Sequence, residues 1–156
     1  MKRILILLLL LIVVLEGRVK MKQKRNLSFG KGYPGQSLSV TIPNNCATAN
    51  ANTNIGKVQL DHTNKDKYTS VTIDWTTPTE LDDGGGNAIS FTNSEAWCDD
   101  STTGTIQDIT DWGSGSYTGL GTNNKYHNMY FGGSISIPVN APTGMYSGTI
   151  SITLTY

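Results

Sequence analysis

The sequence is short of charge, of cysteine and of any helical pattern outside its N-terminus. Charged residues make up 15% of the 156 positions, whereas Thr, Ser, Asn and Gly are abundant, as in extracellular all-β proteins with many turns. The chain still has enough Ile, Val, Leu, Tyr and Trp for one hydrophobic core, which argues against a disordered protein. There are only two cysteines, and no neighbouring His or further Cys completes the four-ligand set of a zinc site.

Catalytic motifs are also lacking. Gly113-Ser-Gly-Ser does not match the nucleophile elbow of hydrolases, and no helix pattern follows it. His62 and His127 lie in turn-like or loop contexts, and we expect both at the surface. Nothing in the sequence pairs two carboxylates for glycosidase chemistry. We therefore expect a protein that is not an enzyme and that carries no cofactor.

Residues 1–17 have the pattern of a secretory signal peptide. Lys2 and Arg3 form a positive start, and Ile4 to Leu15 is an unbroken apolar run of 12 residues. Such a run is too short for a membrane-spanning helix of about 20 residues. We expect export and cleavage near Gly17, with an uncleaved N-terminal anchor as the alternative. The expected location is extracellular or at the cell surface, with membrane contact only through the signal peptide.

Export places the two cysteines in an oxidising compartment, where a disulfide between Cys46 and Cys98 is favoured. Two buried free thiols are the alternative.

The rest of the chain shows the alternation of half-buried strands. In the final run Ile150, Ile152, Leu154 and Tyr156 share one face, and Ser and Thr residues occupy the other. Similar short patterns precede it, separated by Gly, Pro and Asn: Leu38 to Ile42, Val58 to Leu60, Val71 to Trp75, Ile89 to Phe91, Met129 to Phe131 and Ile135 to Val139. About seven to nine strands predict an immunoglobulin-like antiparallel β-sandwich over residues 27–156. We expect residues 44–54 to be a loop and no helix after the signal peptide.

Residues 18–26 are expected to form a basic arm. Residues 18–31 carry six basic side chains and no acidic one, whereas residues 32–156 carry four basic and eleven acidic ones. The arm lacks interleaved aromatics for stacking on bases, so nucleic acid is not expected as a partner. Its imperfect period-two pattern suggests an assembly strand donated to a neighbouring copy, with the expected donor residues Arg18, Val19, Lys20, Met21, Lys22, Leu27 and Phe29. The alternative is that the arm pairs with its own domain or stays disordered.

Two loops offer weaker ligand-binding candidates. Asp82, Asp83 and Asn87 carry oxygen ligands suited to calcium, but their spacing does not match an EF-hand, and a solvated turn is the favoured interpretation. Trp112 lies in a Gly/Ser loop and is the best candidate for an exposed aromatic that stacks on a surface glycan. We expect Trp75 in the core and Trp97 against the disulfide.

Several stretches resemble a known family. Leu27-Ser-Phe-Gly, Gly132-Gly-Ser-Ile-Ser-Ile-Pro and Ala141-Pro-Thr-Gly-Met-Tyr-Ser-Gly148 are similar to secreted bacterial β-sandwich proteins of the domain of unknown function 4402 type, which include fimbria-like surface proteins. The resemblance implies a structural surface protein and carries over no catalytic residue. In the last of these stretches Tyr146 is placed to cap the turn with its hydroxyl, and Gly144 and Gly148 to supply backbone freedom.

These observations predict a secreted, non-enzymatic subunit of a pilus-like or fimbria-like filament, a head-to-tail homopolymer that assembles by N-terminal strand donation. The alternative is a monomeric adhesive or carbohydrate-binding module that uses Trp112.

Overall fold

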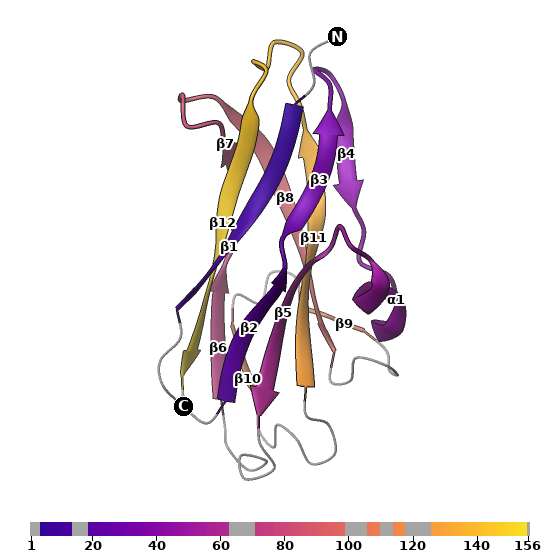
Figure 1. Ribbon diagram of the computed structural model, residues 1–156, viewed down its shortest axis with the longest axis vertical. Helices are drawn as coiled ribbons and strands as arrows, with labels where there is room; N and C mark the ends of the chain where they lie inside the picture. Colours follow the sequence, from indigo (N-terminus) through magenta and orange to yellow (C-terminus); the bar gives the residue numbers. More distant parts are fainter. Residues whose placement is uncertain are drawn as a thin grey trace.

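The computed structural model describes residues 4–13, 19–62, 71–98, 106–109, 114–117 and 126–155 (Figure 1). Over these residues the chain forms twelve strands and one short helix. In order they are β1 (Ile4–Val13), β2 (Val19–Arg25), β3 (Leu27–Gly32), β4 (Ser37–Val40), α1 (Cys46–Ala51), β5 (Gly56–His62), β6 (Val71–Thr76), β7 (Glu80–Asp82), β8 (Ala88–Cys98), β9 (Gln107–Asp108), β10 (Ser114–Tyr117), β11 (Tyr126–Ser136) and β12 (Met145–Thr155).

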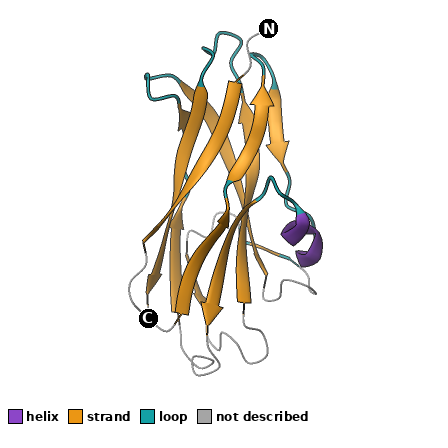
Figure 2. Ribbon diagram, in the orientation of Figure 1, coloured by secondary structure: helices purple, strands orange, loops and turns teal. Residues whose placement is uncertain are grey.

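The strands form one continuous sheet that curls into two facing layers (Figure 2). One layer has the order β10-β6-β12-β1-β3, and the other has the order β7-β8-β11-β5-β2. Strand β7 joins the layers, because its Asp82 pairs with Ser147 of β12. Strand β4 pairs with β11, and β9 pairs with β8. The architecture confirms the prediction of an all-β sandwich.

Alternation along the strands builds the core between the two layers. Ile150, Ile152 and Leu154 of β12 are buried, and the Ser and Thr residues between them are exposed, as predicted. Trp75 is buried at the end of β6, in phase with Val71 and Ile73. The alternation before the last turn stops earlier than expected, because Val139 lies beyond the end of β11 and its side chain is 83% exposed.

Gly132 and Gly133 allow β4 and β8 to approach β11 closely from its two edges. A Cβ atom on Gly132 would overlap the carbonyl oxygen of Val40, which belongs to β4. A Cβ atom on Gly133 would overlap the carbonyl oxygen of Thr92 in β8, and this glycine has a positive φ of 147° that L side chains rarely adopt. The Gly-Gly pair of the sequence is therefore required by backbone packing on both sides of β11.

The helix α1 was not expected. It lies within residues 44–54, which the sequence predicted as a loop (Figure 2). Asn45 caps its N-terminus, because the Asn45 side chain accepts a hydrogen bond of 2.8 Å from the backbone N–H of Thr48. One and a half turns are too short to show helical periodicity, so the Asn cap before an Ala-rich segment was the only signal.

The N-terminal region contributes two strands to the sheet. Ile4–Val13, expected as the apolar part of a signal peptide, is strand β1 and pairs with β12 and β3. Val19–Arg25, expected as an arm outside the sandwich, is strand β2 and pairs with β5 of the same chain. Arg18 lies outside the described residues. The ladder of β1 with β12 is parallel, whereas the other ladders are antiparallel.

Among the residues that the structure describes, no helix has the length and apolar character needed to cross a membrane.

Candidate functional site

The most distinctive site is the position that β1 fills between β3 and β12, here called the β3–β12 slot. Strand β1 makes nine consecutive pairs along β12, from Leu5 with Met145 to Val13 with Thr153. On its other edge it pairs with β3, from Ile4 with Gly32 to Leu8 with Leu27. Figure 1 shows β1 lying lengthwise between these two strands. The slot thus has two walls along Ile4–Leu8, and β12 alone flanks the rest of β1.

The two walls of the slot depend on β1 to different degrees. Strand β12 is also paired with β6 and β7 on its other edge. Strand β3 has no second strand ladder within the described part of the chain. Apart from β1, one backbone bond of β3 is made by the Ser28 N–H to the Asn54 carbonyl oxygen, at 3.0 Å. Without an occupant in the slot, β3 and one edge of β12 would have open backbone groups.

Strand β3 is also anchored by packing that does not involve β1. Leu27 and Phe29 of β3 are buried, and the Phe29 ring packs edge-on against Phe91 of β8 with centroids 5.9 Å apart. This contact joins β3 to the opposite layer. Both walls are therefore fixed to the core, and the gap between them matches one strand.

Strand β2 is attached in a different way, by specific side chains. Met21 is 5% exposed and belongs to the core, and Lys22 forms an ion pair with Asp61 of β5. The Arg25 guanidinium donates hydrogen bonds to the carbonyl oxygens of Asn50, at 2.9 Å, and Ala49, at 3.1 Å. Of the expected donor residues, Met21, Leu27 and Phe29 are thus buried in their own domain, and the exposed Lys20 and Lys22 lie on a strand paired with β5.

The helix α1 links β2 to the rest of the sandwich. Cys46 at its start forms the predicted disulfide with Cys98 at the end of β8, with Cα atoms 6.1 Å apart. At its other end the carbonyl oxygens that Arg25 binds carry the negative end of the helix dipole. The side chain of Asn50 accepts a hydrogen bond from the Lys57 ammonium group. The disulfide and the two cations hold α1 against β2, β5 and β8.

Two buried polar side chains, Lys57 of β5 and Tyr130 of β11, lie near Arg25. Tyr130 is fully buried, and burial raises the pKa of its phenol to about 12 despite the nearby Arg25. Burial also lowers the pKa of Lys57, and Arg25 lowers it further. The Lys57 nitrogen lies 5.9 Å from the centroid of the Tyr130 ring. This cluster stabilises the seam between β2 and β5 through interactions that depend on residue identity.

The turn before β12 is capped by the tyrosine that the sequence singled out. The Tyr146 hydroxyl donates a hydrogen bond of 3.2 Å to the carbonyl oxygen of Pro142. Neither Gly144 nor Gly148 has a positive φ, and Gly148 lies within β12, so the expected role of backbone freedom is corrected at both positions. The capped turn fixes the start of β12, which is one end of the slot.

The loop proposed for calcium is closed by its own hydrogen bonds. One carboxylate oxygen of Asp83 accepts the backbone N–H groups of Gly85, at 2.8 Å, and Asn87, at 3.0 Å. The other oxygen accepts the Asn87 side-chain amide at 2.8 Å, and these bonds lower the pKa of the Asp83 carboxyl group. An Asp82 oxygen accepts the N–H of Gly84. The three candidate calcium ligands, Asp82, Asp83 and Asn87, therefore form the hydrogen bonds of a turn.

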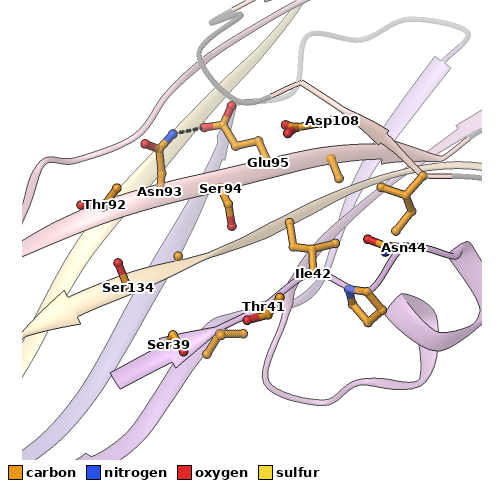
Figure 3. Close-up of a pocket in the computed structure, with 15 residues that line it drawn as sticks. Ser39, Thr41, Ile42, Asn44, Thr92, Asn93, Ser94, Glu95, Asp108 and Ser134 are labelled. Atoms are coloured by element: carbon orange, nitrogen blue, oxygen red, sulfur yellow. Dashed lines mark hydrogen bonds between the residues drawn. The ribbon is translucent and has the colours of Figure 1, made fainter. Parts of the chain in front are cut away.

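A shallow hollow of about 400 Å³ lies on the outer face between β4 and β8 (Figure 3). Hydroxyl side chains line it, among them Ser39, Thr41, Ser94 and Ser134. Figure 3 shows Glu95 and Asn93 on the other side of β8 from Ser94, with the Asn93 amide donating to Glu95 at 2.7 Å. Glu95 is 2% exposed and also accepts a hydrogen bond from the Trp75 indole N–H. This carboxylate thus connects β8 to β6 inside the sandwich.

The aromatic expectations are met in part. Trp97 is buried beside Cys98, and its ring stacks on His127 with centroids 5.6 Å apart. His127 is therefore buried, not at the surface, because the period-two pattern of β11 continues to its position. Trp112, the candidate for glycan stacking, lies outside the described residues.

The slot itself was missed by sequence reasoning. Its only signal was the run of β-branched and Leu residues in Ile4–Val13, which also has the composition of a strand but was explained as a signal peptide. The sequence pattern alone does not indicate that the first strand, β1, pairs with the last strand, β12.

Comparison with known proteins gives a family match. The model of the family described as Domain of unknown function (DUF4402) matches residues 19–156 of this chain. No curated protein sequence matches it. The matched region begins at β2, so it contains both walls of the slot and leaves out the occupant β1.

Proposed function

The chain belongs to the family described as Domain of unknown function (DUF4402), and on that premise we propose that it is a secreted, non-enzymatic structural protein of the cell surface, a subunit of a pilus-like or fimbria-like filament. The carrying observation is the β3–β12 slot. Its occupant lies outside the family match, although β1 completes the sheet that the matched region builds.

Unpaired backbone groups at the slot support this proposal. A sandwich with a vacant strand position exposes unpaired N–H and C=O groups along two edges, together with part of its core. If residues 1–17 are removed during export, as their pattern predicts, β1 leaves with them. The vacancy is then filled most simply by a strand of a neighbouring copy, with main-chain hydrogen bonds supplying the affinity. Such a contact joins two different surfaces, so repeated addition gives a head-to-tail chain.

The arm itself is a less suitable donor than the sequence suggested. Donation of Arg18–Phe29 would remove Met21, Leu27 and Phe29 from their own core and would break the Arg25 bonds to α1. Each buried apolar side chain is worth about 1.5–3 kcal/mol. The proposal therefore limits the donor to Val19–Arg25 of a neighbouring copy, which exchanges its pairing with β5 for pairing in the β3–β12 slot. Leu27 and Phe29 then stay in their own core.

The test is expression of the chain with residues 1–17 included in a secreting bacterial host, followed by cell fractionation, negative-stain microscopy and light scattering of the exported protein. We expect surface-associated multimers or filaments whose mass exceeds that of the monomer at micromolar concentrations. Exported protein that stays strictly monomeric would overturn the proposal and favour the monomeric surface module.

A further inference from the structure

We infer that the hollow between β4 and β8 is a binding site for a neutral saccharide. The hollow measures about 400 Å³, which lies within the usual size range of ligand pockets. The filament proposal does not use this surface, because the β3–β12 slot belongs to the other layer of the sandwich. The inference therefore goes beyond the proposed function and does not depend on it.

The hollow lies over a position where β11 contributes only backbone. Side chains alternate along the strand, so Gly132 is on the same outer face as Tyr130 and Ser134. A Cβ atom on Gly132 would lie 2.9 Å from the Ser94 hydroxyl oxygen and 3.0 Å from Cγ1 of Ile42, and both of these residues line the hollow. The lining therefore comes mainly from the elements on either side of β11.

Hydroxyl side chains make up most of the polar lining. Ser134 of β11 pairs with Ser39 of β4 on one edge and with Thr92 of β8 on the other. Paired residues point to the same face of a sheet, so these three side chains form one row across the strands. All three are exposed. Ser94 and the exposed Thr41 add two further hydroxyl groups to the lining (Figure 3).

The charge of the lining favours a neutral ligand. Among the described residues that line the hollow, none is Lys, Arg or His. The Glu95 carboxylate lies on the other side of β8, where it accepts hydrogen bonds from Trp75 and Asn93, and Asp108 is exposed. A phosphate, sulfate or carboxylate group would find no counter-charge here. A neutral polyol matches the lining better, because hydroxyl groups both donate and accept hydrogen bonds.

The apolar part of the lining fits the C–H surface of a sugar ring. Ile42, Pro43 and Ile106 are half-buried and line the hollow together with the hydroxyl groups. A saccharide ring presents hydroxyl groups at its edge and C–H groups on its faces, so one ring can contact both kinds of lining. A peptide also presents donors and acceptors to hydroxyl groups, and it is therefore the competing ligand in the test.

NMR titration of the full chain tests the ligand class. The neutral probes are maltotriose, cellotriose, mannotriose and triacetylchitotriose, and a neutral Gly-Ser peptide is the comparison. We expect at least one saccharide to shift the backbone amides of Ser94, Ser134 and Ile106, and the peptide to leave them unchanged. The saccharide with the largest shifts is then compared with a derivative in which one primary hydroxyl is oxidised to a carboxylate. We expect this derivative to bind more weakly.

Two matched triple variants test the hydroxyl groups. The hollow variant removes three exposed hydroxyl groups of the lining: Ser39→Ala, Thr41→Val and Ser134→Ala. The control variant removes three from the exposed face of β12 in the other layer: Ser147→Ala, Thr149→Val and Ser151→Ala. We expect the hollow variant to bind the saccharide at least about tenfold more weakly and the control to bind like wild type. Because all the substituted side chains are exposed, both variants should keep the Tm of wild type within a few degrees.

Absence of shifts with every neutral saccharide would overturn the inference, as would equal binding by the hollow and control variants. Tighter binding of the carboxylated derivative, or binding of the peptide alone, would assign another ligand class and would overturn it as well. The result is separable from the filament test. Saccharide binding by a strictly monomeric protein contradicts only the filament, and filaments without saccharide binding contradict only this site.

Discussion

The two N-terminal strands, β1 and β2, are attached to the same sandwich by different physical means. Strand β2 is held by individual side chains: buried Met21, the Lys22 pair with Asp61, and Arg25 on the end of α1. Strand β1 has a backbone ladder with β12 over Leu5–Val13 and one with β3 over Ile4–Leu8. A contact of the first kind is specific to one sequence. A contact of the second kind can be satisfied by any strand with the right alternation, which is a property of an exchangeable site.

The largest expected effect comes from removing the disulfide that anchors α1, the helix to which β2 is bound. Replacing both Cys46 and Cys98 by Ala removes a cross-link between residues 52 apart. The chain-entropy estimate predicts a loss of about 4 kcal/mol in the free energy of unfolding. Urea unfolding of the variant, compared with the oxidised wild type, measures this loss. A change below about 1 kcal/mol would show that the disulfide does not anchor α1.

The next effect concerns the buried residue of β2. Met21→Ala leaves a cavity under the strand, and we expect a loss of about 3 kcal/mol in the free energy of unfolding. The neighbouring Lys20→Ala removes an exposed side chain and should change it by less than about 0.5 kcal/mol. Thermal and urea unfolding of the pair give both values. Equal effects would mean that β2 is not seated in the core.

A smaller effect is expected where β2 meets α1. Arg25→Met keeps the aliphatic stem but removes the charged hydrogen bonds to the carbonyl oxygens of Ala49 and Asn50, which should cost about 2 kcal/mol. Lys24→Met removes the same charge from an exposed neighbour and is the control. We expect faster amide hydrogen exchange in β2 and α1 of the Arg25 variant and unchanged exchange in β1. Loss of protection in β1 as well would contradict two independent attachments.

The smallest effect is visible only at alkaline pH. The pKa of Tyr130 is raised to about 12 in the folded chain, against about 10 in an unfolded chain. The contribution of its neutral form to stability is therefore complete below pH 10 and is lost as the pH rises to about 12. Tyr130→Phe should remove this loss, with a change within about 1 kcal/mol at neutral pH. Unfolding followed at several pH values checks the difference between the two proteins, and parallel pH profiles would contradict the assignment to Tyr130.

Sequence patterns predicted the buried face of the strands and the disulfide but missed the short helix. The alternation of Ile150, Ile152 and Leu154 and the pairing of Cys46 with Cys98 are confirmed. The first follows from local burial, and the second has no competing pairing because the sequence has two cysteines. The helix α1 was missed because six residues with one Asn cap give too little periodicity.

The two ends of the slot show a second limit. Tyr146 was recognised from its place in the last turn, since its hydroxyl bonds only four residues back along the chain. The partnership of Ile4–Val13 with β12 spans nearly the whole chain, and its apolar composition fits a leader as well as a strand. Local patterns determine which face is buried, but they do not determine which strand lies beside which.

Amide hydrogen exchange on the full chain with Leu10→Lys and Ile12→Lys tests the exchangeable slot most directly. We predict that amides of β3 and of the edge of β12 that faces β1 lose protection and that β2 and β5 stay protected. Unchanged protection in β3 and β12, or a loss that spreads equally to β2 and β5, would contradict the account.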